Sequence, residues 1–270
     1  MNRLTRNLYL LAVVLTLAGC YERESRTKNV NAARATITRN WPAAGVEQVR
    51  VCGVDGSISV EASATNEISL LATAEGDLEV KKGQENDGLF QTTLEGDTLR
   101  IGCSEKKNRK RWNVNFLWND DDVEIDYVLK VPPAVSLSAT TVNGKIATRG
   151  IDGETRATSV NGTIDVETAG THELRVSTVN GRVKAKFTRE FSGAKFTSVN
   201  GGVQATFPKN ASFAVSLSQV NGDFEASFPL SIHSNPGSRR VSGEVNGGKH
   251  DLKITTVNGD VELARSNGKT

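Results

Sequence analysis

The sequence predicts an all-β fold, a β-solenoid or β-helix-like stack of about ten repeats of roughly 20 residues. Two observations lead to this prediction. Glycine recurs at a nearly constant spacing along most of the chain, and apolar and polar residues alternate on both sides of it. A fixed period in this range is the signature of a repeat architecture. Alternation with a period of two is typical of strands with one buried and one solvated face.

Residues 1–19 come before the fold and have the pattern of a signal peptide. A short basic region leads into an apolar run at residues 8–17, which is too short to span a membrane as a helix. The run ends in Leu17-Ala18-Gly19-Cys20, which resembles the lipobox of bacterial lipoproteins. That resemblance implies cleavage before Cys20 and acylation of its thiol. We therefore expect a membrane-anchored lipoprotein.

Residues 20–44 are polar and charged without a hydrophobic period, so we expect a lipidated tether there. Loss of residues 1–19 removes Arg3 and Arg6 from 33 basic residues, which leaves 31 basic and 31 acidic residues. A neutral chain is unlike a basic nucleic-acid binder, and we expect no nucleic-acid partner. Tyr21 after the cysteine resembles lipoproteins sent to the outer membrane. The expected location is the cell envelope, at the outer membrane if the organism has two membranes.

Residues 45–265 hold the repeats, and residues 266–270 form a short tail. Val-Asn-Gly occurs seven times, and a broader template (apolar, polar, Gly, any residue, apolar) finds further copies. We expect these glycines and asparagines to form one structural corner, where positive φ is accessible to them. The predicted corner residues are Gly56, Gly76, Gly96, Asn143, Gly144, Asn161, Gly162, Asn180, Gly181, Asn200, Gly201, Asn221, Gly222, Gly243, Asn258 and Gly259.

Two architectures fit this pattern. Asn-Gly between alternating strands is the strongest short-range signal for an antiparallel hairpin, and a series of hairpins would form a meander or a sandwich. Alternatively, each repeat is one coil of a solenoid, with the asparagines stacked in hydrogen-bonded ladders. We favour the solenoid, because the repeat length grows gradually and Ala185, Ala205 and Ala226 occupy matching positions. Stacked units of this kind bury a continuous core.

Cys52 and Cys103 remain once Cys20 is assigned to lipid, and an even number in an oxidising compartment is compatible with a disulfide. The strand pattern weighs against the bond, because it places Cys52 on the polar parity and Cys103 on the apolar parity. No histidine lies at metal-ligand spacing from either cysteine, so we expect no metal site.

An insertion at about residues 104–122 interrupts the repeats and concentrates basic and aromatic residues. One hypothesis is a contact loop for anionic lipid, lipopolysaccharide, glycan or a partner protein. The alternative, which we favour, is a loop whose tryptophans cover an open edge of the stack. The residues concerned are Lys106, Lys107, Arg109, Lys110, Arg111, Trp112, Phe116 and Trp118.

A family resemblance follows from Tyr127-x-Leu129-x-Val131-Pro132 and the Thr141-Val142-Asn143-Gly144 that comes after it. The pattern resembles the putative adhesin domain family, a group of bacterial envelope proteins with a domain of unknown function. The resemblance covers roughly residues 45–265. It implies β-strand repeats in a helix-like or roll-like stack and has no established catalytic residues to carry over.

The sequence contains no nucleophile elbow, phosphate loop, dinucleotide fingerprint or paired-histidine zinc motif. We therefore expect no enzyme activity and no cofactor. The leading hypothesis is a lipid-anchored, non-catalytic envelope protein that binds glycan or protein, or forms part of the envelope architecture. One alternative is an envelope-stress or assembly accessory that acts by protein contacts through residues 104–122. The other is a polysaccharide-acting enzyme on a β-helix scaffold, with aspartates beside the turns as its catalytic groups.

Overall fold

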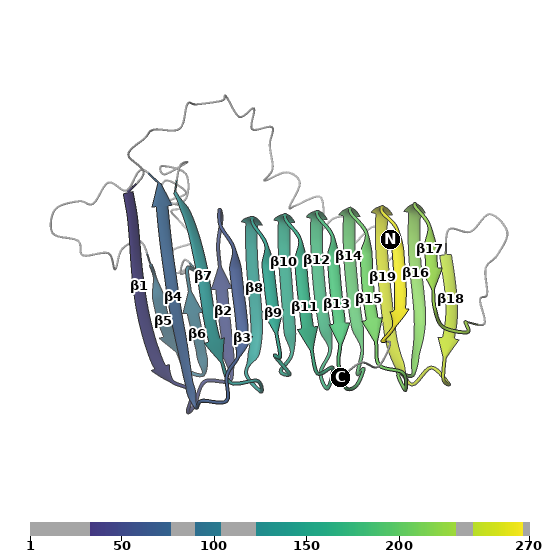
Figure 1. Ribbon diagram of the computed structural model, residues 1–270, viewed down its shortest axis with the longest axis horizontal. Helices are drawn as coiled ribbons and strands as arrows, with labels where there is room; N and C mark the ends of the chain where they lie inside the picture. Colours follow the sequence, from purple (N-terminus) through teal and green to yellow (C-terminus); the bar gives the residue numbers. More distant parts are fainter. Residues whose placement is uncertain (1–32, 77–89, 104–122, 231–239, 267–270) are drawn as a thin grey trace, which may run out of the picture. The chain divides into compact units, whose positions relative to one another are not determined.

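The computed structural model describes residues 33–76, 90–103, 123–230 and 240–266. In these residues the secondary structure is entirely β, as predicted, and it forms two ten-stranded sheets (Figure 1). No helix in these ranges is long and apolar enough to cross a membrane.

Sheet A contains, in spatial order, β1 (Ala33–Pro42), β4 (Glu67–Gly76), β7 (Glu124–Val131), β3 (Ile58–Ala62), β9 (Ile146–Arg149), β11 (Ile164–Thr168), β13 (Val183–Phe187), β15 (Val203–Phe207), β20 (Val261–Arg265) and β17 (Phe224–Ala226). Sheet B contains, in spatial order, β18 (Arg240–Val245), β16 (Phe213–Asn221), β19 (His250–Asn258), β14 (Ala194–Asn200), β12 (Leu174–Asn180), β10 (Thr155–Asn161), β8 (Ser136–Asn143), β2 (Gln48–Cys52), β6 (Thr98–Ile101) and β5 (Thr92–Glu95).

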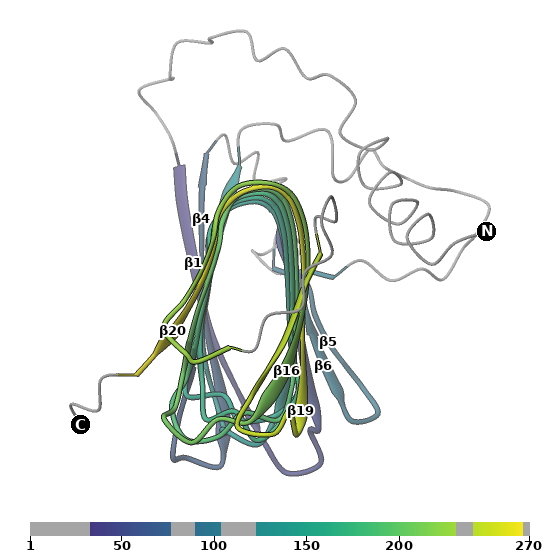
Figure 2. The same cartoon turned by 90° about the vertical axis from the view of Figure 1, so that its right-hand side faces the viewer.

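The predicted solenoid is confirmed by the way successive repeats pair. Each regular repeat supplies one strand to sheet B, turns at Asn-Gly, and supplies the next strand to sheet A. Equivalent strands of neighbouring repeats are parallel and in register, as in β10 against β12 and β11 against β13. Figure 2 looks along the stack and shows the turns superposed in one arc that joins the facing sheets. The alternative architecture, a series of antiparallel hairpins at Asn-Gly, is wrong because these turns join strands of different sheets.

The order of coils in space differs from their order in the sequence. The coil β19–β20 lies between β14–β15 and β16–β17, with parallel pairing on both sides in both sheets. Strand β18 pairs antiparallel with the outer side of β16 and ends sheet B.

The other end of the stack is built from antiparallel strands. Strand β4 pairs antiparallel with both β1 and β7, and β5 and β6 form an antiparallel hairpin. We expected residues 20–44 to be a tether, but residues 33–42 form β1. Its half-buried side chains Ala35, Ile37 and Trp41 pack against the core. The threonines and arginines between these small or isolated apolar residues hide the alternation in the sequence.

The core lies between the two sheets and consists of the inward residues of every coil. The part of the core formed by residues 187–228 is aromatic. Phe187, Phe191, Phe207, Phe213 and Phe228 form one cluster there, and the stacked rings of Phe207 and Phe213 have their centroids 4.6 Å apart. Burial of each phenylalanine stabilises the fold by about 1.5–3 kcal/mol. The sheets are therefore held face to face, and their outer faces remain free to carry polar side chains.

Candidate functional site

The corner between the sheets is built from the motif Ser/Thr-Val-Asn-Gly. In the coil β12–β13 the motif is Thr178-Val179-Asn180-Gly181. The N–H of Gly162 donates to the carbonyl of Asn180 at 2.9 Å, and each further corner repeats this bond. A Cβ on Gly181 would lie 2.0 Å from the carbonyl oxygen of Gly162. Only glycine allows the backbones of successive coils to approach this closely.

We expected positive φ to be the reason for glycine at the corner, and for most of the column that reason is wrong. Gly201 has a φ of 155° and Gly222 a φ of 124°, but Gly181 does not have a positive φ. What the stacked glycines share is backbone contact with the previous coil. The column runs Gly56, Gly144, Gly162, Gly181, Gly201, Gly259 and Gly222.

The asparagines before these glycines form a side-chain ladder along the stack. Each amide Nδ2 donates to the Oδ1 of the preceding coil. The bonds, of 2.8 or 2.9 Å, run from Asn143 to Asp55, Asn161 to Asn143, Asn180 to Asn161, Asn200 to Asn180, Asn258 to Asn200 and Asn221 to Asn258. The backbone bonds of the corner run in the opposite direction. The repeated Asn-Gly is thus explained by packing and hydrogen bonding within the stack.

Three of the predicted corner glycines lie elsewhere. Gly76 is the last residue of β4, and Gly96 occupies the turn of the β5–β6 hairpin with a φ of 60°. Gly243 lies inside β18 opposite Val215. The chain turns instead at Asn246, where φ is 49°, and at the two glycines after it. The sequence template is short enough to match a glycine in any turn or strand, so it finds these positions too.

Cys52 and Cys103 form a disulfide, with an S–S distance of 2.12 Å and a Cα–Cα distance of 5.0 Å. Strands β2 and β6 are neighbours with Val51 opposite Ile101. Gly102, with a φ of 67°, follows Ile101 and interrupts the alternation. The parity argument against the bond fails at this glycine, because it redirects the chain toward Cys52.

Cys20 and the whole candidate contact loop at residues 104–122 lie outside the described residues. The lipidation site and the loop hypothesis stay predictions.

The outer face of sheet B carries three rows of polar side chains that run across the strands. The register places the carboxylates of Glu154, Glu173 and Asp251 at the strand starts. The next outward position forms a basic row: Arg100, Arg50, Arg156, Arg175, Lys195 and Lys253, with Ser138 between Arg50 and Arg156. The following position forms a hydroxyl row: Thr140, Thr158, Ser177, Thr197 and Thr255.

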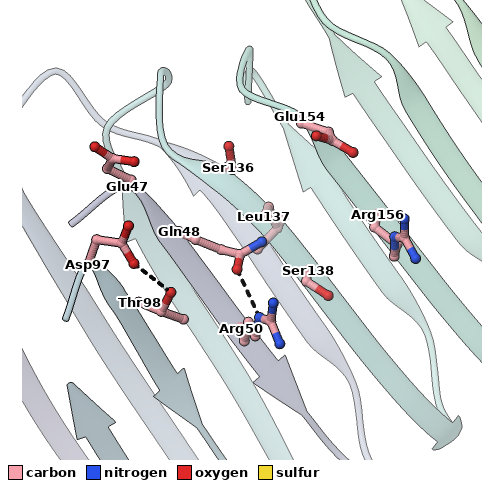
Figure 3. Close-up of a pocket in the computed structure, with 10 residues that line it drawn as sticks. All are labelled: Glu47, Gln48, Arg50, Asp97, Thr98, Ser136, Leu137, Ser138, Glu154 and Arg156. Carbon is pink, nitrogen blue, oxygen red and sulfur yellow. Dashed lines mark hydrogen bonds between the residues drawn. The ribbon is translucent and has the colours of Figure 1, made fainter. Parts of the chain in front are cut away.

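A hollow of about 510 Å³ lies on this face over β2, β6, β8 and β10 (Figure 3). It exists because the outward residues of β8, Ser136 and Ser138, are small while their neighbours are long. The guanidinium groups of Arg50 and Arg156 stand on either side of Ser138. The remaining lining residues are Glu47, Gln48, Asp97, Thr98, Leu137 and Glu154.

Two cations of the basic row, Arg175 and Lys253, form ion pairs with carboxylates of the same face. Arg175 Nη2 lies 2.6 Å from Glu173 Oε2 and Arg175 Nη1 3.8 Å from Glu154, while Lys253 pairs with Asp251 at 3.0 Å. The hydrogen bond from Arg175 lowers the pKa of Glu173 and raises the pKa of Arg175. Arg50 donates to the neutral Gln48 at 2.8 Å. Within the described ranges, neither Arg50 nor Arg156 has a carboxylate within 4.0 Å.

Among the aspartates beside turns, which the enzyme alternative would need as catalytic groups, Asp152 has the most polar side-chain contacts. Thr171 donates to the Asp152 carboxylate, and Arg189 lies 3.3 Å from the same group. His172 Nδ1 lies 2.7 Å from the Asp152 carbonyl oxygen, which can only accept, so Nδ1 carries the proton and cannot activate the Thr171 hydroxyl. These contacts hold a turn together. In the described part of the chain, no three His, Cys, Asp or Glu residues are grouped to hold a metal.

The sequence matches the model of the Toastrack family, DUF4097, over residues 22–264. No protein with a curated function matches it.

Solved structures that match this chain include a putative cell adhesion protein from Clostridium sporogenes, which is 9% identical with a TM-score of 0.48 and matches 87% of this chain and 100% of its own. A putative adhesin from Bacteroides fragilis is 11% identical with a TM-score of 0.33 and matches 85% of this chain and 97% of its own. A putative lipid binding protein from Parabacteroides distasonis is 12% identical with a TM-score of 0.25 and matches 84% of this chain and 96% of its own.

Proposed function

We propose that this chain, which belongs to the Toastrack family DUF4097, is a non-catalytic cell-envelope protein and binds glycans. Lipid on Cys20 holds it on the membrane, and the outer face of sheet B is its binding surface. The membrane and an envelope or surface glycan are its partners, and no cofactor takes part.

The observation that carries this proposal is the hollow on sheet B and the rows that continue from it. Carboxylates, guanidinium groups and hydroxyls recur at the spacing of neighbouring strands, about 4.8 Å. Sugar rings carry hydroxyls at regular intervals along a polymer, and such groups bind to side chains of these types. The hollow offers little to a protein partner, because its apolar lining residue, Leu137, is only 1% exposed. Protein interfaces concentrate apolar and aromatic contacts at their centres.

The polar groups of the turns support a role without catalysis. A glycosidase needs two carboxyl groups free to act as acid and as base or nucleophile. Here the Asp152 carboxylate accepts from Thr171 and Arg189, and the Asp260 carboxylate accepts from the N–H of Asp223 at 2.9 Å. Both carboxylates are engaged in holding turns.

The test has two parts. In the first, the full chain and a Cys20→Ala variant are expressed, and their distribution between membrane and soluble fractions is measured. We expect the variant to leave the membrane fraction, whereas unchanged sedimentation would contradict lipid anchoring.

In the second part, the soluble Cys20→Ala chain is applied to a panel of neutral and acidic polysaccharides, and the bound glycans are recovered and sized. Retention of a glycan at its original length supports the proposal. Shortened glycans would establish the enzyme alternative instead, and no retention of any polysaccharide would refute glycan binding.

A further inference from the structure

The hollow on sheet B has an asymmetric distribution of charge. Figure 3 shows the guanidinium groups of Arg50 and Arg156 on one side and the carboxylates of Glu47, Asp97 and Glu154 on the other. The two arginines lie on β2 and β10, which flank β8, so their backbones are about 10 Å apart. The small Ser138 leaves the space between them open.

Arg50 and Arg156 are exposed and have no carboxylate within 4.0 Å among the described residues, unlike Arg175, which pairs with two glutamates. A guanidinium group binds a carboxylate through two parallel hydrogen bonds. A ligand carboxylate placed over Ser138 would therefore meet donors from both sides without displacing an existing ion pair.

The opposite side of the hollow limits what else the ligand can carry. Glu47, Asp97 and Glu154 accept hydrogen bonds from hydroxyl groups but repel a second negative charge. A carboxylate with one charge fits this surrounding better than a doubly charged phosphate. The ligand chemistry is thus a ring with a carboxylate on one edge and hydroxyls on the other, which describes a uronic acid.

The same arrangement continues along the stack. Beyond Arg156 the basic row proceeds through Arg175, Lys195 and Lys253, each one strand further. An extended polysaccharide laid across the strands would meet one cation about every 4.8 Å. On the outer face of sheet A, Lys186 lies 3.1 Å from Glu167, and the neutral Gln204 donates to Glu262 at 2.9 Å.

From these observations we infer that the hollow between Arg50 and Arg156 is a subsite for the uronic acid residues of an acidic polysaccharide, whose chain runs across the strands of sheet B. This inference rests on the proposed glycan-binding function and names its ligand class. Arg50 and Arg156 bind the carboxylate, the three acidic residues accept from ring hydroxyls, and the remaining basic row holds neighbouring acidic sugars.

The experiment compares binding of polygalacturonate and of its fully methyl-esterified form to the soluble Cys20→Ala chain. Esterification removes the carboxylate charge and keeps the sugar backbone. In this background, Arg50→Gln with Arg156→Gln removes both guanidinium groups, and Ser138→Phe fills the hollow without changing charge. Arg149→Gln is the matched control, because Arg149 is an exposed arginine of β9 in sheet A. Circular dichroism confirms that each variant is folded.

We expect polygalacturonate to bind at least tenfold more tightly than its ester. The double arginine variant and Ser138→Phe should each lose tenfold or more, while Arg149→Gln should change binding less than twofold. Equal binding of the ester, or an equal loss in Arg149→Gln, would overturn the inference. Binding of polygalacturonate that the double arginine variant and Ser138→Phe leave unchanged would refute the uronic acid subsite while the proposed function stands. No binding to any glycan would refute both.

Discussion

The regular coils from β8 to β15 and the antiparallel end formed by β1, β4, β5, β6 and β7 are held together in different ways. In the regular coils the glycine contact and the asparagine bond recur at every corner. At the antiparallel end neither recurs, and a disulfide and long paired strands take their place. The comparison indicates that a repeated fold depends on motifs only where each unit has an identical neighbour.

The largest expected effect is from a side chain in the glycine column. Gly181→Ala places a Cβ 2.0 Å from the carbonyl oxygen of Gly162, and the neighbouring coil cannot move away without breaking its own contacts. We expect a loss of about 4 kcal/mol in the free energy of unfolding, or failure to fold. Urea denaturation measures it.

The control is Gly247→Ala, outside the column. Gly247 has a φ of 85°, and an added Cβ there meets nothing within 4 Å. Backbone strain alone should cost about 1–2 kcal/mol. Equal losses for the two variants would show that coil stacking does not explain the column.

Removal of the disulfide probes the other side of the comparison. Cys52→Ser with Cys103→Ser opens a loop of 51 residues, and we expect a loss of about 3 kcal/mol. Hydrogen exchange should accelerate in β5 and β6. In β10, β12 and β14 the protection of the amides should fall by no more than the loss in the global free energy of unfolding accounts for. Uniform acceleration through the stack would contradict a local role for the bond.

The asparagine ladder should show a smaller effect that depends on position. Asn180→Ala removes a bond to Asn161 and a bond from Asn200, whereas Asn221→Ala removes the bond to Asn258. We expect about 1–2 kcal/mol for the first and roughly half of that for the second, because these groups are exposed to water. Thermal unfolding compares the two, and an equal or larger loss for Asn221→Ala would contradict the ladder as a source of stability.

The smallest effect concerns the pair Glu173 and Arg175. The lowered pKa of Glu173 means that its contribution is present above its ordinary pKa of 4.5 and is lost as the pH falls through the lowered value. Glu173→Gln should therefore reduce the dependence of stability on pH below 4.5. The change should be slight, because both side chains are about 40% exposed. Denaturation midpoints of both proteins across this pH range check the sign.

The sequence was sufficient to predict the solenoid and its corner, because Asn-Gly and alternation are local. It could not place β19–β20 between β14–β15 and β16–β17. The repeats share the same corner motif, so the motif does not specify which coil lies next to which. The rows on sheet B were missed for a related reason. Arg50, Arg156 and Lys195 are far apart in the chain, and only the register of their strands brings them into one row. The only sign of the hollow in the sequence is the pair of small residues Ser136 and Ser138. Their position between strands that carry arginines follows from the strand order, which the sequence does not give.

The position of β19–β20 also has a consequence for the order of folding. β16–β17 is synthesised before β19–β20, yet its parallel strand pairs in both sheets are made with that later coil. The chain therefore cannot be completed by adding coils in the order in which they are made. The parallel pairs of β16 and β17 form only when the coil β19–β20, which separates them from β14 and β15, is available. A chain interrupted after residue 230 would lack the coil β19–β20, which is an interior layer of the stack and supplies the parallel partners of β16 and β17.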